Sequence, residues 1–259
     1  MTIQTLVAAV NKDRNILPET MNLGTDSIVI NQCDKNDYSE FAYKDCKIKW
    51  YDFAERGVGL SRNNALMRSD ADIVLFADED IVYEDDVNKK IADAFASHPD
   101  ADMLLFNVDV TEERRTYNIG KESRVHLYNC GRYPAYSFAC KRDVLHRLNI
   151  TYNLLFGGGA KYANGEDSLF IWECIKKGMK VYAVPILIGR EIPRPSTWFE
   201  GYNEKFFHDR GVLYKYLYGC MALPMGIRFL KKNQNTMCES ISFHDALTLL
   251  KKGIREADV

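Results

Sequence analysis

The chain has 259 residues and a formal net charge of -2, with 46% hydrophobic and 27% charged residues. This composition is typical of a globular protein with a substantial core, and the near-neutral charge gives no general attraction to nucleic acid, so no nucleic-acid partner is expected. No apolar stretch approaches the roughly 18 residues of a transmembrane helix, and the run at 6–10 is too short for a signal peptide. The seven cysteines lack CxxC spacing, which predicts free thiols in a reducing cytoplasm.

Strands and helices alternate in the first half of the sequence. We expect strands at 2–10, 26–31, 47–53, 73–77 and 103–108, and helices at 61–68 and 85–97. Such alternation predicts an open, mostly parallel α/β sheet with right-handed crossovers. In sheets of this kind, ligands bind beyond the carboxyl ends of the strands.

The second half has fewer regular segments. Residues 109–135 are polar and predict a loop-rich or hairpin insertion. The elements expected after it are strands at 136–140 and 180–188 and helices at 142–148 and 168–177, with a glycine-rich stretch at 156–167. The tail from residue 196 is aromatic, basic and partly helical by its pattern. One domain with a C-terminal extension follows from this organisation.

Three acids, Asp78-Glu79-Asp80, directly follow the apolar run at 73–77. In an extended chain Asp78 and Asp80 point to the same side. Magnesium and manganese prefer carboxylate oxygens and often complete their coordination with substrate phosphates. One aspartate would bind the metal while the other reaches a ribose or sugar hydroxyl. The competing interpretation is a solvated acidic turn before a helix whose N-terminus favours acids.

A second acidic motif, Gly165-Glu166-Asp167, lies where a helix is expected to begin, after a stretch of glycines. The helix dipole holds a carboxylate ionised there, so that it can accept a hydroxyl proton as a general base. The competing interpretation is that Asp167 or Ser168 merely caps the helix.

The segment 56–66 contains Gly57 and Gly59 between a strand and a helix. A dinucleotide-binding fingerprint needs a third glycine at position 62, where the sequence has Arg62. Arg62 would instead contact a phosphate or another part of a nucleotide, or form a salt bridge to a surface acid.

The ordered set of motifs resembles family 2 glycosyltransferases of the GT-A fold. The set is a strand that ends in Asn11, then Ser61-Arg62-Asn63, then Asp78-Glu79-Asp80, then Gly165-Glu166-Asp167. The second is similar to the family's SRN element, the third to its DxD motif and the fourth to its acceptor-side ED motif. The similarity covers most of residues 1–220. Ser196-Thr197-Trp198 and the aromatic tail are similar to the bacterial branch that builds capsule, exopolysaccharide or O-antigen.

The resemblance implies a GT-A catalytic domain at 1–195, with a nucleotide-sugar half at 1–108 and an acceptor-side half at 109–195. A helical, aromatic and basic extension at 196–259 follows it. The segment between the first two strands departs from the family pattern because it is short and contains Pro18, which disfavours a full helix there.

The resemblance also implies an inverting, metal-dependent transfer of a sugar, UDP-hexose or UDP-N-acetylhexosamine being the expected donor. The acceptor would be a glycan or a lipid-linked saccharide in surface polysaccharide synthesis. Mn²⁺ or Mg²⁺ would be held by Asp80 and Asp78, with His208 a further candidate ligand. The candidate donor-binding residues are Asn11, Asp34, Arg62, Asp78, Glu79 and Asp80. Asp34 is the first choice for the base because the usual aspartate-rich turn reads NQCDKND at 31–37. Asp167 would be the general base, with Glu166 its substitute.

Two other functions compete with this one. A GT-A-like nucleotidyltransferase normally needs a glycine-rich basic loop after the first strand, and residues 7–15 contain no glycine. A non-catalytic nucleotide- or carbohydrate-binding module would have no need of a general base.

The tail also suggests a membrane contact. Residues 205–232 contain six Lys or Arg residues and one acid, interleaved with aromatic residues. Basic charge combined with aromatic side chains suits an anionic interface, and each cation near such a surface contributes about 1 kcal/mol. Peripheral binding at the inner face of the cytoplasmic membrane is therefore expected. The competing interpretation is that the aromatic residues pack on the catalytic domain.

Overall fold

The computed structural model describes residues 1–112, 117–193 and 201–257. The strands are β1 (Ile3–Val10), β2 (Asp26–Gln32), β3 (Asp37–Tyr43), β4 (Cys46–Phe53), β5 (Ile73–Asp78), β6 (Ile81–Tyr83), β7 (Met103–Asp109), β8 (Ser123–Arg124), β9 (Phe138–Lys141) and β10 (Val181–Glu191). The α-helices are α1 (Leu17–Thr20), α2 (Val58–Arg68), α3 (Val87–Ser97), α4 (Arg142–Arg147), α5 (Glu166–Lys176), α6 (Glu204–Tyr218), α7 (Ala222–Met237) and α8 (Phe243–Glu256). Short 3₁₀ turns are η1 (Cys130–Arg132), η2 (Ala135–Ser137) and η3 (Gly219–Met221).

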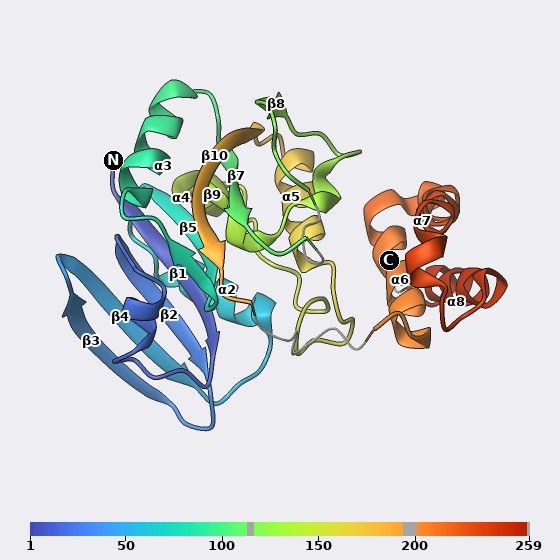
Figure 1. Cartoon of the computed structure of the whole chain (residues 1–259), viewed down its shortest axis with the longest axis horizontal. Coiled ribbons are helices and arrows are strands. Elements are labelled where there is room, and N and C mark those ends of the chain that lie inside the picture. The colour runs from blue at the N-terminus through green and yellow to red at the C-terminus, as the bar shows by residue number, and fades with distance from the viewer. Residues whose placement is uncertain (113–116, 194–200, 258–259) are drawn as a thin grey trace.

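The strands form one mixed sheet in the order β3-β4-β2-β1-β5-β9-β7-β10-β6, with β8 paired to β10 (Figure 1). β1 lies between β2 and β5 and is parallel to both, so that Val7 is paired with Val29 on one side and Ala77 on the other. The sequence order reverses at β1, which makes the crevice at its carboxyl end the place where such sheets bind ligands.

Helices cover both faces of the sheet because the central strands are apolar on both faces. Along β1, Leu6 belongs to the core under α2, α4 and α5, while Val7 belongs to the core under α1 and α3. The same alternation holds along β5, where Phe76 points to the first core and Leu75 to the second. The open α/β sheet expected from the alternating pattern is confirmed.

Two local features differ from expectation. Residues 37–43 form β3, an antiparallel edge strand hairpinned to β4, where no element was predicted. Glu166 and Asp167 belong to the first turn of α5, which begins two residues earlier than the expected helix at 168–177. Between β1 and β2 only the four-residue α1 forms, with Pro18 in its first turn, as the short segment indicated. All seven cysteines are free.

The three C-terminal helices gather to one side of the sheet (Figure 1). α6 and α8 cross closely at Gly211 and Gly253, where a Cβ would lie 2.1 Å from the Leu250 carbonyl oxygen and 2.0 Å from the His208 carbonyl oxygen, respectively. α6 also packs on the loop before α5, because Gly165 leaves room for Leu213. The expected helical extension is therefore confirmed, and it packs against the loop that precedes α5. No helix in the described part of the chain is long and apolar enough to cross a membrane.

The close crossing predicts that Gly211→Ala destabilises the protein. The added methyl group would overlap the Leu250 carbonyl, and overpacking of this kind typically costs about 1–3 kcal/mol. Urea unfolding measures the change. Gly120→Ala is the matched control, since a Cβ at Gly120 meets nothing within 4 Å. Equal stability of the two variants would contradict the described packing.

Candidate functional site

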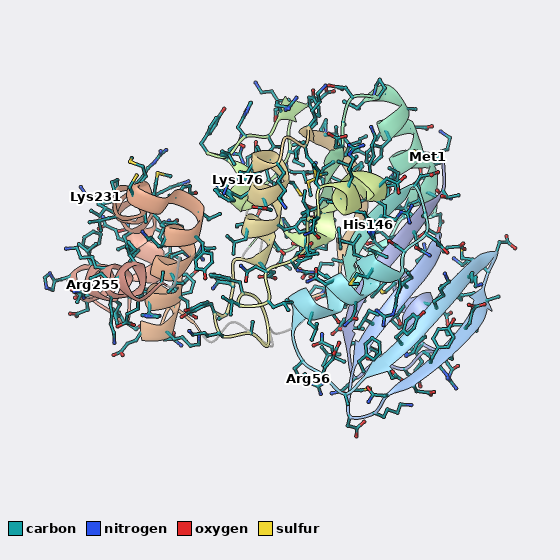
Figure 2. The ribbon with its side chains drawn as sticks, turned by 180° about the vertical axis from the view of Figure 1, so that it is seen from behind. Met1, Arg56, His146, Lys176, Lys231 and Arg255 are labelled. Carbon is teal, nitrogen blue, oxygen red and sulfur yellow. The ribbon has the colours of Figure 1, made fainter. Side chains whose placement is uncertain are left out.

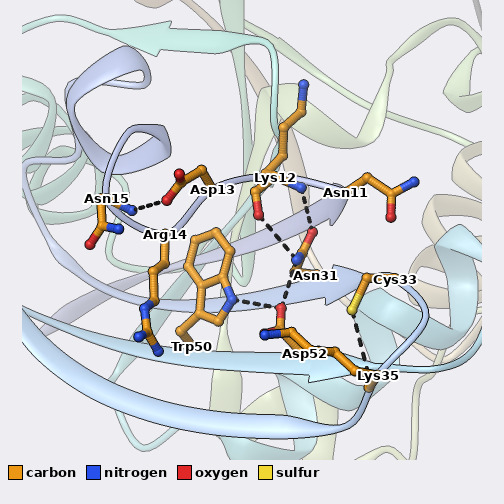
Figure 3. Close-up of a pocket in the computed structure, with 10 residues that line it drawn as sticks. All are labelled: Asn11, Lys12, Asp13, Arg14, Asn15, Asn31, Cys33, Lys35, Trp50 and Asp52. Atoms are coloured by element: carbon orange, nitrogen blue, oxygen red, sulfur yellow. Dashed lines mark hydrogen bonds and ion pairs between the residues drawn. The ribbon is translucent and has the colours of Figure 1, made fainter.

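A polar pocket of about 410 Å³ lies at the carboxyl ends of β1, β2 and β4 (Figure 3). Its volume is within the range of small-molecule sites. The lining residues are Asn11, Lys12, Asp13, Arg14, Asn15, Asn31, Cys33, Lys35, Trp50 and Asp52. They come from strand ends and from the turns that follow, which is why residues far apart in sequence meet here.

Asp52 is the buried acid of this pocket, with 4% of its surface exposed. Its Oδ1 accepts hydrogen bonds from Asn31 Nδ2 (2.6 Å) and Trp50 Nε1 (2.9 Å), as Figure 3 shows. Lys35 Nζ lies 3.2 Å from Oδ2. Burial acts to raise the pKa of the Asp52 carboxyl, but these contacts outweigh burial and lower it. Asp52 is therefore held as a carboxylate at the pocket.

The three acids Asp78-Glu79-Asp80 form an acidic tip after β5, and they make different contacts. Asp78 ends β5, and Asp80 is buried, with its backbone oxygen accepting a hydrogen bond from Ile192 N (2.8 Å). Glu79 instead accepts from the backbone N–H of Val10 (2.6 Å) and lies 3.6 Å from Lys12 Nζ. Glu79 thus ties the tip to the end of β1, whereas the surface acidic turn proposed as the competing interpretation would leave its acids solvated.

Arg62 joins this tip to the second acidic motif. Its Nη2 donates to Asp78 Oδ1 (2.8 Å), and its Nη1 donates to Asp167 Oδ1 (2.9 Å) and Glu166 Oε1 (3.2 Å). The arginine side chain is 3% exposed and its guanidinium carbon lies 5.2 Å from the centre of the Tyr152 ring. Burial opposes the charge, but the carboxylates of Asp78 and Asp167 raise the pKa of Arg62 further above its ordinary value.

The glycine-containing loop before α5 passes close to Glu166 and so helps to position the acidic motif Gly165-Glu166-Asp167. Gly157 has φ of 102°, and a Cβ there would lie 2.9 Å from the Glu166 carboxyl carbon. Gly165 has φ of 112° and precedes Glu166 directly. Both positions need glycine because of the backbone conformation and the lack of space. The Asp167 Oδ2 accepts a hydrogen bond from the Ala135 N–H (3.0 Å), which orients the carboxyl.

The Asp167 carboxyl has a perturbed acidity. Burial, together with the nearby Glu166 carboxylate, raises the pKa of Asp167 to about 8, and Arg62 only partly offsets this. A carboxyl with a raised pKa beside other acids is a candidate acid–base group.

The other residues predicted from the sequence lie in different places. Asn11 lines the pocket, whereas Asp34 is exposed and is not among the pocket-lining residues. His208 lies on α6 and contacts Asp209 Oδ1 (3.2 Å) and Glu256 Oε2 (3.0 Å) within the helical extension. Ser196-Thr197-Trp198 lies outside the described residues.

Two contributions to the site were not predicted. Asn31 and Asp52 were not among the candidate residues, although both lie near the ends of strands that were predicted. A surface acid was one of the expected partners of Arg62, whereas its partners belong to the two acidic motifs themselves. The rule that ligands bind beyond the carboxyl ends of parallel strands would have identified Asn31 and Asp52. No local sequence pattern indicates the ion pairs of Arg62.

The donor set fits a hard divalent cation. Asp78 and Asp80 supply carboxylates at one strand end, the ligand type that Mg²⁺ and Mn²⁺ prefer. Across 1–112, 117–193 and 201–257, no three His, Cys, Asp or Glu side chains are grouped to hold a metal by themselves. A site of one or two carboxylates is the kind that substrate phosphates complete.

Replacing Arg62 with Met should strongly destabilise the protein at pH 8. Asp78, Glu166 and Asp167 would then face one another without a cation, and breaking a buried ion pair on one side costs about 3–5 kcal/mol. The loss should be smaller at pH 5, because a carboxyl with a raised pKa keeps its proton there and the repulsion falls. Denaturant unfolding at both pH values, with the exposed Arg255→Met as control, measures this; a loss that does not depend on pH would count against the network.

Comparisons with known proteins identify the family and the fold of the chain. The model of the family described as "Glycosyl transferase family 2" matches residues 6–149. A search of curated protein sequences gives no match. Among solved structures, S. aureus TarS 1-349 in complex with UDP-GlcNAc is similar, with a TM-score of 0.64 and 14% identity over 93% of this chain and 74% of that one.

The mannosyltransferase PcManGT from Pyrobaculum calidifontis, in complex with GDP-Man and Mn²⁺, is a second similar structure. It has a TM-score of 0.53 and 11% identity over 98% of this chain and 74% of that one. At these identities the solved structures show the fold, which is that of the GT-A glycosyltransferases. The family match covers more than half of the chain and carries the assignment: this chain belongs to glycosyl transferase family 2 and is a glycosyltransferase.

Proposed function

We propose that the protein transfers a hexose or N-acetylhexosamine from a UDP-sugar to a saccharide acceptor, with inversion at the anomeric carbon and with a divalent cation. The observation that carries the proposal is the contact of Arg62 with both Asp78 and Asp167, since it brings a donor-side and an acceptor-side acid to one guanidinium. Family membership favours this function over a nucleotidyltransferase and over a non-catalytic module.

The nucleotide base would enter the pocket at the ends of β1, β2 and β4. Asp52 suits base recognition better than Asp34, because it is a buried carboxylate that lines the pocket while Asp34 is exposed. A carboxylate has about four lone-pair sites, so Asp52 can accept a further hydrogen bond from a ring N–H such as that of uracil. A base without this N–H would leave the buried acceptor unsatisfied, which is costly.

The diphosphate would lie near Asp78 and Asp80. When bound there, a divalent cation would neutralise the charge that develops on the leaving diphosphate. Asp80 would be the principal ligand of the cation, and Asp78 would bind the ribose or the donor sugar. Arg62 would keep Asp78 in position through its Nη2, and Glu79 would fix the tip to β1.

Asp167 would accept the proton of the acceptor hydroxyl as that oxygen attacks the anomeric carbon. Its Oδ2 is oriented by the Ala135 N–H and its Oδ1 by Arg62. Its raised pKa keeps the carboxylate basic enough to remove a hydroxyl proton in the transition state. Glu166 is the second candidate and also tunes the acidity of Asp167.

The acceptor that we propose is a glycan or a lipid-linked saccharide of a bacterial surface polysaccharide, with the enzyme at the inner face of the cytoplasmic membrane. The phenylalanines of 205–232 pack among the helices: Phe207 is fully buried, and Phe206 and Phe229 lie in the same cluster. The tyrosines at 214, 216 and 218 are only partly buried. Membrane contact would therefore rest on exposed cations such as Lys231, labelled in Figure 2 on the part of the molecule farthest from β3.

The direct test of activity is incubation with a panel of UDP-sugars, with and without manganese, while release of UDP is measured. Release in the presence of metal from one or a few of these sugars is expected. No release from any donor, with or without added saccharides, would contradict the proposal.

Asp80→Ala should abolish the manganese-dependent part of UDP binding while the fold remains intact, because the principal metal ligand is lost. Isothermal titration calorimetry with UDP, with and without Mn²⁺, measures the effect. Asp93→Ala removes an exposed carboxylate of α3 and serves as the control. Unchanged manganese-dependent binding in Asp80→Ala would show that the metal assignment is wrong.

Asp167→Asn should lower kcat by on the order of 10²–10⁴-fold with UDP binding preserved, because the amide keeps the shape but cannot take the proton. Glu173→Gln, on the same helix and paired with Lys177, is the control. A near-normal rate in Asp167→Asn together with a large loss in Glu166→Gln would move the role to Glu166.

Charge reversal of Lys231 and Lys232 to Glu should reduce binding to anionic vesicles, because each cation near the surface contributes about 1 kcal/mol. Flotation with phosphatidylglycerol vesicles at low salt measures binding. Lys89→Glu, on α3, controls for the general change in charge. Binding that is absent in the unmodified protein, or that is unaffected by the reversal, would contradict the membrane contact.

A further inference from the structure

Arg210, on α6, is a half-buried arginine that has no acidic partner within residues 1–112, 117–193 and 201–257. None of the residues in the described ranges forms a hydrogen bond or ion pair with it, and its Nε is buried without a hydrogen-bond acceptor. A charged side chain is rarely buried unless it is paired, because removing it from water is costly. Arg62 illustrates the usual solution, since three carboxylates surround it.

Aromatic rings surround Arg210 instead of acids. Its guanidinium carbon lies 5.1 Å from the centre of the Phe206 ring and 5.0 Å from that of Phe229. The neighbouring charges and dipoles that favour its ionised form come from Tyr214, Tyr202 and Tyr218. Burial lowers the pKa of Arg210, and these tyrosines offset the effect only in part. Arg210 therefore remains a cation to which the described part of the chain gives no counter-charge.

The cluster that Arg210 forms with these aromatic residues lies near the loop that leads to the acidic motif at 165–167. Arg210 and Tyr214 are four residues apart on α6 and so share one side of the helix. The adjacent side of α6 packs on the loop that leads to the ED motif, where Leu213 fills the space over Gly165 and Asp209 Oδ2 accepts from the Ala163 N–H (3.0 Å). Tyr218, one turn further on, is close enough to Cys130 of η1 to interact with it electrostatically. The cluster thus lies against the acceptor-side half.

We propose that Arg210, with Tyr202, Tyr214 and Tyr218, forms a subsite for an anionic group of the acceptor saccharide, a phosphate or a carboxylate. The inference rests on the proposed function and specifies its acceptor. A guanidinium binds both anions through two parallel hydrogen bonds, and aromatic faces offer an apolar surface to a sugar ring. The anionic group of the ligand would supply the negative charge that the described residues do not place beside Arg210.

A purely structural role is the alternative, in which Arg210 serves only to stack on Phe206 and Phe229. The two roles differ in their effect on stability. Replacement of an unpaired buried cation by an apolar side chain of similar length is often neutral or stabilising. Arg210→Met should therefore keep or raise the melting temperature while it removes the binding of anions.

The test uses the full chain and three probes that share a hexose ring: glucose 6-phosphate, glucuronate and the neutral methyl glucoside. Ligand-detected NMR titration compares the unmodified protein with Arg210→Met and with Arg228→Gln, an exposed cation of α7. We expect at least one anionic probe to bind ten-fold or more tightly than methyl glucoside. Arg210→Met should remove that preference, and Arg228→Gln should keep it. The stronger anionic probe identifies the phosphate or the carboxylate as the natural group.

Equal binding of all three probes, unchanged binding of the anions by Arg210→Met, or an equal loss in Arg228→Gln would each overturn the subsite. So would a fall in the melting temperature of Arg210→Met that accompanies the loss, since the arginine would then be structural. UDP binding measured on the same samples separates the two proposals. If UDP binds and the anions do not discriminate, the subsite alone fails, and if UDP binds to none of the proteins, the proposed function fails.

Discussion

One buried cation holds three carboxylates that come from distant parts of the chain. Arg62, on α2, contacts Asp78 at the end of β5 and both Glu166 and Asp167 at the start of α5. Burial, and then repulsion from the neighbouring acids, which outnumber the cation, raise the pKa of one of them, Asp167. The glycine loop, the Ala135 N–H and the packing of α6 on Gly165 all serve to keep these groups at contact distance. The fold thus keeps like charges close together in the candidate site. Perturbed pKa values that result from such arrangements are common at functional sites.

The sequence predicted the parts of the fold that depend on local pattern. Apolar runs such as 73–77 became central strands, and Phe76 and Leu75 point to opposite cores as a period of two requires. The carboxyl-end rule predicted that Asp78 and Asp80 lie at the ligand-binding edge of the sheet, and β5 does end at Asp78. Residues 37–43 were missed because their polar, alternating pattern is that of a solvated edge strand, and such a strand forms only when β4 is present to pair with it.

The predictions that depend on long-range contact were less complete. Arg62 was identified as a candidate residue, yet its partners lie 16, 104 and 105 residues away and no spacing rule links them. Asp34 was chosen for the base because it follows β2 in sequence, whereas Asp52 reaches the pocket from β4 through pairing of the two strands. His208 remains a predicted metal ligand, although the carboxylates of Asp209 and Glu256 already occupy its two ring nitrogens.

The central claim is that Asp167 is the base and that its pKa is set by its burial and by its charged neighbours. The pH dependence of kcat/KM tests it most directly, since this ratio reports the ionisation of groups in the free enzyme. For the unmodified protein, kcat/KM should rise with pH and level off above about 8, where the Asp167 carboxyl has lost its proton. In Glu166→Gln a repelling charge is removed, so the same rise should occur at lower pH. A profile that is flat through this range, or one that moves to higher pH in Glu166→Gln, would contradict the account.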